Sequence, residues 1–187
     1  MANAVKIRKT MLKQGIAEEI ARQFDFPDVR GSYAPILPLV AQMDELLTPD
    51  QCLAIMQEQG CSITGKPDKA YRAFGKENAD KTVAERIPLL DDIDTVHKYN
   101  VRLNLDGTLS VWWGEQGYDD CPCPVVKDVP RPRLISKTHC ACCGGHARHH
   151  LQNGLGVKLK LQNVVSSSAS SDGKERCEFL FEIVEGK

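Results

Sequence analysis

The sequence predicts an α+β fold, in which N-terminal helices pack on a four-stranded antiparallel sheet made of two hairpins, with a cysteine-rich loop and a helix between the hairpins. Two observations predict it. Apolar residues recur at helical spacing in residues 1–98, whereas two pairs of segments alternate apolar and polar residues in 99–187. A chain of 187 residues without an internal repeat is expected to form one domain, 1–187, whose core needs no disulfides.

The first half contains three strong helix patterns. An apolar stripe with a spacing of four predicts a first helix that ends before Pro27, and a second helix is expected after Pro38. A third helix is expected to begin at Thr48-Pro49-Asp50-Gln51, which has the residues of a capping box, and to end at Gly60. The first stripe consists of Leu12, Ile16, Ile20 and Phe24, and weaker helix patterns cover 68–74 and 83–87.

The second half contains two hairpin patterns. Segments 101–105 and 109–113 alternate on either side of Asp106-Gly107, a favoured pair for a two-residue turn. Segments 157–161 and 177–183 alternate as well. Between them, the serine-rich stretch from Ser166 to Gly173 is predicted to be a hairpin loop too polar and flexible to pack.

The segment between the hairpins is predicted to be a loop followed by a helix. Residues 114–138 are rich in glycine, proline and charged residues, which favours a loop. From Cys140 to Asn153 the spacing suits a helix, with Gly154 as its stop.

Thiols and imidazoles are concentrated in this segment. Thiolate and imidazole are the ligands that zinc and iron–sulfur centres prefer, and scattered core cysteines would have no reason to cluster in this way. We therefore predict that zinc is bound here by four of six candidates, with iron–sulfur left open as the alternative. The candidate metal ligands are Cys121, Cys123, Cys140, Cys142, Cys143 and His146.

Helical spacing ranks some of these candidates. Cys140 and Cys143 are three residues apart and are favoured as a pair over Cys142. His146 is favoured over His149 and His150, which are expected to be exposed near the end of the helix.

Four further residues are assigned less directly. Cys52 and Cys177 lie on apolar faces and are expected in the core. Cys61 has no partner that the sequence predicts, and His139 is either a supporting donor or an ordinary loop residue.

Composition excludes several classes of partner. The 24 basic and 25 acidic side chains give a net charge of −1, which argues against a nucleic-acid or membrane-surface binder. No run of about 18 apolar residues is long enough to cross a bilayer. We therefore expect a cytoplasmic protein with no nucleic-acid and no membrane partner, in which grouped cysteines are metal ligands or reactive thiols.

The second half also carries a family resemblance. The order CPC, then CxCCxGH, then GKERCEFLFEI resembles the vinyl reductase type of small-molecule-binding domain and related uncharacterised bacterial proteins grouped with amino-thiazoline carboxylate hydrolases. In those families a closing strand reads Gly-x-x-x-Cys-x-Phe, which Gly173, Cys177 and Phe179 match. The resemblance covers roughly Asn100 to Ile183. It implies an antiparallel sheet packed on helices, a pocket for a small, often apolar ligand, and clustered cysteines that bind metal.

Two functions follow as hypotheses. The first is a zinc-containing protein that binds a small-molecule ligand. The second is a cysteine-dependent hydrolase or reductase of a small heterocycle, with the thiolate of Cys142 or Cys143 near His146 at a helix N-terminus. A third hypothesis is a redox switch in which Cys142 and Cys143, or the CPC pair, form a disulfide. A homodimer is left open.

Overall fold

A computed structural model of the protein describes residues 3–26, 36–61, 63–96, 98–113, 121, 123–127 and 129–185. Within these ranges the fold is α+β, as predicted, and no described helix is long and apolar enough to cross a membrane. The helices are α1 (Ala4–Lys13), α2 (Glu18–Ala21), α3 (Ile36–Leu46), α4 (Pro49–Met56), η1 (Gln57–Gln59), α5 (Lys66–Glu77), α6 (Val83–Arg86), η2 (Ile87–Asp92), α7 (Pro124–Lys127) and α8 (Lys137–Leu155). The strands are β1 (Asn100–Leu103), β2 (Leu109–Trp113), β3 (Lys158–Ser166) and β4 (Cys177–Glu185).

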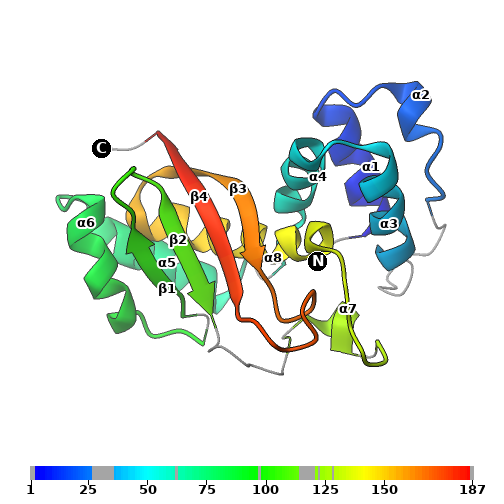
Figure 1. Ribbon diagram of the computed structural model, residues 1–187. Helices are drawn as coiled ribbons and strands as arrows, with labels where there is room; N and C mark the ends of the chain where they lie inside the picture. The colour runs from blue at the N-terminus through cyan, green and yellow to red at the C-terminus, as the bar shows by residue number, and fades with distance from the viewer. Residues whose placement is uncertain are drawn as a thin grey trace.

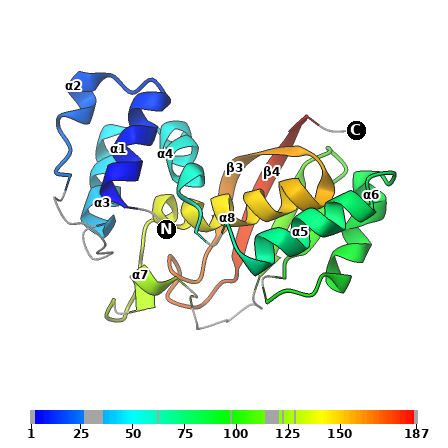
Figure 2. The ribbon, with the colours of Figure 1, turned by 180° about the vertical axis from the view of Figure 1, so that it is seen from behind.

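The four strands form one antiparallel sheet in the order β1-β2-β4-β3. The two predicted hairpins are therefore joined through their inner strands, where Val111 pairs with Phe179. Helices α5 and α8 lie across one face of this sheet, whereas α1 to α4 gather at its side (Figures 1 and 2). The face covered by these helices is apolar. Its side chains include Leu109, Val111, Phe179 and Phe181, which are fully buried.

The first hairpin was predicted correctly, but its turn was not. Asn104 pairs with Thr108 through a backbone hydrogen bond of 2.8 Å, so the turn has three residues and not two. Gly107 takes a φ of +82°, which is the left-handed position that a three-residue turn requires. As a result Leu105 points into solvent, fully exposed.

The predicted helix over Leu12 to Phe24 is wrong in its bounds. The chain instead forms α1 and the short α2, and Gly15 takes a φ of +76° between them. Leu12 is half exposed on α1, whereas Ile16 is buried in the connection. The apolar residues keep a spacing of four across both helices, and periodicity alone does not show that the helix is interrupted between them.

The capping signature before α4 was predicted correctly. The Thr48 hydroxyl accepts a hydrogen bond from the Gln51 backbone, and the Gln51 side chain accepts one from the Thr48 backbone. A second capping box, formed by Thr82 and Glu85, begins α6.

Helix α8 is the central element of the fold. It packs against α3, α4, η1, α5 and β3, so it contacts both the N-terminal helices and the sheet. It ends at Gly156, which takes a φ of +70°, and not at the predicted Gly154, which lies inside the helix. Glycines allow the closest contacts: a Cβ on Gly145 would lie 2.0 Å from the Gln57 carbonyl oxygen, and one on Gly75 would lie 2.0 Å from that of Asn153.

The serine-rich stretch after β3 packs, contrary to prediction. Ser167, Ser168 and Ala169 are buried. The Ser167 hydroxyl accepts a hydrogen bond from the Ser170 backbone, and the Ala169 carbonyl accepts one from Ile135. Serine side chains thus satisfy the polar groups that burial would otherwise leave unpaired, which allows a polar segment to cover the beginning of α8.

Gln57 joins three elements through one buried side chain. Its Oε1 accepts hydrogen bonds from Arg148 on α8 at 2.9 Å and from the Leu161 backbone on β3 at 3.1 Å. We expect Gln57→Met to lower the free energy of unfolding by about 2 kcal/mol, because both donors lose their acceptor while the volume stays similar. Urea denaturation would measure it. Gln162→Met, at an exposed position on β3, is the control, and an equal loss in the two variants would contradict the expectation.

Candidate functional site

The N-terminal part of α8 brings the predicted site residues together. The Ser136 side chain caps the helix by accepting a hydrogen bond from the Thr138 backbone. The helix begins three residues earlier than predicted, so His139 belongs to its first turn and is almost completely buried. Gly144, directly after Cys143, faces Leu161 and Phe179 of the sheet.

Cys123 and His139 form a buried thiol–imidazole contact. The Cys123 Sγ lies 3.4 Å from the His139 Nε2, and the two side chains are 9% and 1% exposed. A hydrogen bond from the Cys143 thiol, and next the contact with His139, lower the pKa of Cys123 to about 4 against the opposing effect of burial. Burial by itself would lower the pKa of His139, but its contact with Cys123 raises it above the usual value. The pair therefore favours a thiolate beside an imidazolium.

Two further thiols adjoin this pair. The Cys143 thiol contacts the sulfur atoms of both Cys123 and Cys142. These contacts raise the pKa of Cys143, whereas the hydrogen bond from Cys143 lowers that of Cys142. Cys143 is thus the one of these three thiols whose protonated form is favoured. We call Cys123, His139, Cys142 and Cys143 the thiol cluster.

Cys140 faces a different neighbourhood from Cys143. Its thiol donates a hydrogen bond of 3.2 Å to the hydroxyl of Ser167, in the buried serine stretch. Burial raises the pKa of Cys140, and it raises that of Cys121 to about 11. Cys177 is buried at the start of β4, as predicted, and burial raises its pKa too. These three cysteines are held as neutral thiols, in contrast to Cys123.

His146 lies one helical turn beyond the thiol cluster and has a partner that the sequence did not indicate. Its Nδ1 is 3.8 Å from the Sγ of Cys61, which follows η1. A Cβ on Gly60 would lie 2.8 Å from the His146 backbone, so η1 and α8 approach closely enough for this contact. Cys61 and His146 are separated by 85 residues in sequence, and therefore no local pattern could pair them.

His150 is fully buried, contrary to the expectation that it is exposed. The Tyr99 hydroxyl is 2.9 Å from its Nδ1, and its ring stacks on Tyr71 with a centroid distance of 5.0 Å. His149 is also held in place, because its Nε2 lies 2.7 Å from a carboxylate oxygen of Asp68 on α5. Both histidines thus connect α8 to neighbouring elements, a role that their position near the end of the helix did not predict.

The six predicted metal ligands thus lie in three environments. Cys123, Cys142 and Cys143 belong to the thiol cluster, Cys121 and Cys140 lie beside it with Cys177, and His146 contacts Cys61. Among the described residues, no three His, Cys, Asp or Glu side chains form a group that could hold a metal ion. Zinc and iron–sulfur therefore remain predictions.

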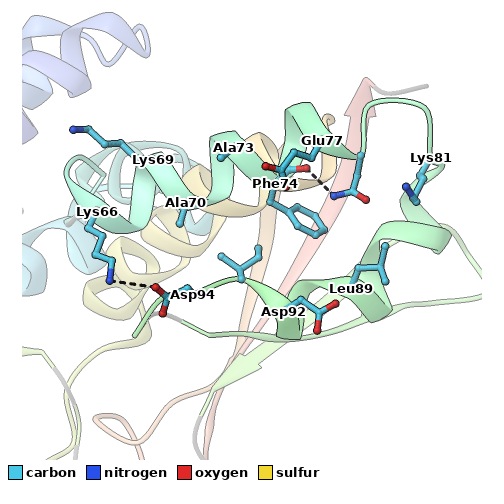
Figure 3. A pocket seen from close by; sticks show the side chains of 12 residues that line it. Lys66, Lys69, Ala70, Ala73, Phe74, Glu77, Lys81, Leu89, Asp92 and Asp94 are labelled. Atoms are coloured by element: carbon cyan, nitrogen blue, oxygen red, sulfur yellow. Dashed lines mark hydrogen bonds and ion pairs between the residues drawn. The ribbon is translucent and has the colours of Figure 1, made fainter.

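An open groove lies elsewhere on the surface, between α5 and η2 (Figure 3). Its volume is about 690 Å³, and an ion pair of 3.4 Å between Lys66 and Asp94 crosses one end. Phe74 and Leu89 form part of its apolar lining, and lysines and carboxylates surround them. None of the predicted site residues lines this groove, so it gives the thiol cluster no substrate pocket.

Comparisons of the chain with protein-family models, with curated proteins and with solved structures found no match. The resemblance to the vinyl reductase type of domain therefore stays a prediction.

Proposed function

We propose that the protein is a cysteine-dependent enzyme, a hydrolase or reductase of a small electrophilic substrate such as an activated heterocycle. Cys123 is the nucleophile and His139 is its partner. The observation that carries the proposal is the 3.4 Å contact between the Cys123 Sγ and the His139 Nε2 in a site from which water is largely excluded. An imidazole within reach of a thiol is the arrangement that activates cysteine nucleophiles.

The structure supports a division of roles. The thiolate of Cys123 attacks the electrophilic atom of the substrate, and His139 supplies the positive charge that keeps the sulfur ionised. His139 lies in the first turn of α8, where the helix dipole also favours negative charge nearby. The roles differ from those expected from sequence, because Cys123 replaces Cys142 or Cys143 as nucleophile and His139 replaces His146.

Sub-stoichiometric labelling with iodoacetamide tests the nucleophile. At pH 6 we expect Cys123 to be labelled roughly 70-fold faster than Cys121, because the larger thiolate fraction of Cys123 outweighs the lower nucleophilicity of each thiolate. Cys121 is the internal control, since it lies two residues away on the same loop and is more exposed. Peptide mapping by mass spectrometry gives both rates. If labelling instead follows exposure, so that Cys121 reacts first, the proposal fails.

As a second proposal, the protein is the zinc-containing small-molecule-binding protein predicted from the sequence, and the donor atoms of the site favour it. Cys123 and His139 are two soft donors 3.4 Å apart, and the side chains of Cys142 and Cys143 on α8 interact with Cys123, which together is the donor type that zinc prefers. Elemental analysis of untagged protein under reducing conditions tests it. One equivalent of zinc, with labelling of Cys123 that begins only after a chelator is added, would favour this proposal over the nucleophile. Metal-free protein with rapid labelling would reject it.

A further inference from the structure

Cys123 and Cys143 are placed as a pair of thiols from different segments. Cys123 lies immediately before α7, whereas Cys143 lies in the second turn of α8. Cys143 lies four residues after His139 on α8, on the same helix face, and His139 contacts Cys123 at 3.4 Å, so Cys143 is the neighbour with which the Cys123 sulfur makes its thiol hydrogen bond. Helix α8, which carries Cys143, is held on several sides by close packing.

The other cysteine pairs are less suited to a bond. Cys142 and Cys143 are adjacent on a helix, where a disulfide would distort the backbone. Cys140 is turned toward Ser167. The pairing of Cys123 with Cys143 differs from both pairs that the sequence suggested for a redox switch.

We infer that the protein also reduces hydroperoxides, with Cys123 as the sulfur that is oxidised and Cys143 as the thiol that resolves it. This inference rests on the proposed role of Cys123 as nucleophile. His139 adjoins the sulfur that attacks, and the Cys143 thiol adjoins the same sulfur from α8, so both reaction partners are in place before the oxidant arrives.

The two steps balance. The Cys123 thiolate attacks the hydroxyl oxygen of the hydroperoxide, the O–O bond breaks and Cys123 becomes a sulfenic acid, while the other oxygen takes the proton of the His139 imidazolium and leaves as water or an alcohol. The Cys143 sulfur then attacks the Cys123 sulfur, the S–O bond breaks and water leaves with the thiol proton of Cys143. The two thiols lose two electrons, and the peroxide gains them. An external dithiol such as dithiothreitol restores both thiols.

The test treats the fully reduced protein with one equivalent of hydrogen peroxide, blocks the remaining thiols with iodoacetamide, and maps the peptides by mass spectrometry. We expect a disulfide between the peptides of Cys123 and Cys143, at a mass two hydrogen atoms below their sum, which dithiothreitol removes. Cys61→Ser is the control, because Cys61 contacts His146 outside the thiol cluster and its loss should leave the disulfide intact.

Cys143→Ser should lose the disulfide and leave Cys123 as a sulfenic acid that dimedone captures. Serine keeps the size and a hydrogen-bond donor, and circular dichroism checks the fold. The wild-type map decides even if this variant does not fold. A peroxide-induced disulfide between any other pair, or oxidised Cys123 beside a free Cys143, would overturn the inference.

The outcome separates this inference from the proposed function. If iodoacetamide labels Cys123 first but peroxide produces no Cys123–Cys143 disulfide, only the peroxide inference fails. If Cys123 is not the fastest thiol toward iodoacetamide, the proposed nucleophile fails and the inference fails with it.

Discussion

Gly145→Ala is expected to lower the free energy of unfolding by about 3 kcal/mol, since overpacking against a rigid backbone is among the costliest single changes. The added Cβ would lie 2.0 Å from the carbonyl oxygen of Gln57 and 2.7 Å from its carbonyl carbon. Both atoms belong to the backbone of η1, so one element has to move away from the other. The gain in helix propensity, about 1 kcal/mol, is too small to offset this.

Gly144→Ala is the matched comparison, because it lies next to Gly145 in the same helix. Its Cβ would meet side-chain atoms of Leu161 and Phe179 at 2.8 and 3.0 Å, and these side chains can shift by a few tenths of an ångström. We expect a smaller loss, about 1–2 kcal/mol. Urea denaturation with a common m-value gives both numbers. Equal losses in the two variants would show that backbone contact with η1 is not the limiting feature.

The second large effect concerns the pH dependence of labelling at Cys123. Because its pKa is lowered to about 4, the rate of reaction with iodoacetamide should stay nearly constant down to about pH 5 and fall only as the sulfur is protonated below that. An ordinary thiol, with a pKa of 9.0, loses a factor of ten in rate for each pH unit below its pKa. At pH 5 the fraction of Cys123 present as thiolate is about 10⁴ times that of an ordinary thiol. Because each Cys123 thiolate is a weaker nucleophile, its expected advantage in labelling rate is roughly 50-fold.

His139→Phe should move this profile to higher pH, because phenylalanine fills a similar volume without the contact or the positive charge that favours the thiolate. The His139 Nδ1 is buried with no hydrogen-bond partner among the described residues, so phenylalanine removes no second bond there. The rate at pH 5 should therefore drop in the variant while the rate at pH 9 changes little. Thermal unfolding serves as the fold control. An unchanged profile would contradict the role assigned to His139.

Local sequence chemistry predicted the elements that depend on near neighbours. The capping box of Thr48 and Gln51 acts over three residues, and it begins α4 as expected. The alternation around Asp106-Gly107 predicted the first hairpin, although the turn is one residue longer. Between Leu12 and Phe24 a single apolar pattern extends over two short helices. The sequence therefore predicted one helix, whereas the structure has α1 and α2 with Gly15 between them.

The sequence by itself determined the α+β class, the two hairpins and the concentration of thiols and imidazoles around the start of α8, because each of these depends on residues close together in the chain. Only the tertiary structure decided which side chains meet. Cys123 and His139 are 16 residues apart, and Cys61 and His146 are 85 apart, so their contacts follow from how α7, η1 and α8 pack. Hydrogen bonding, burial and the resulting pKa shifts depend on those distances, and no spacing within a single segment fixes them.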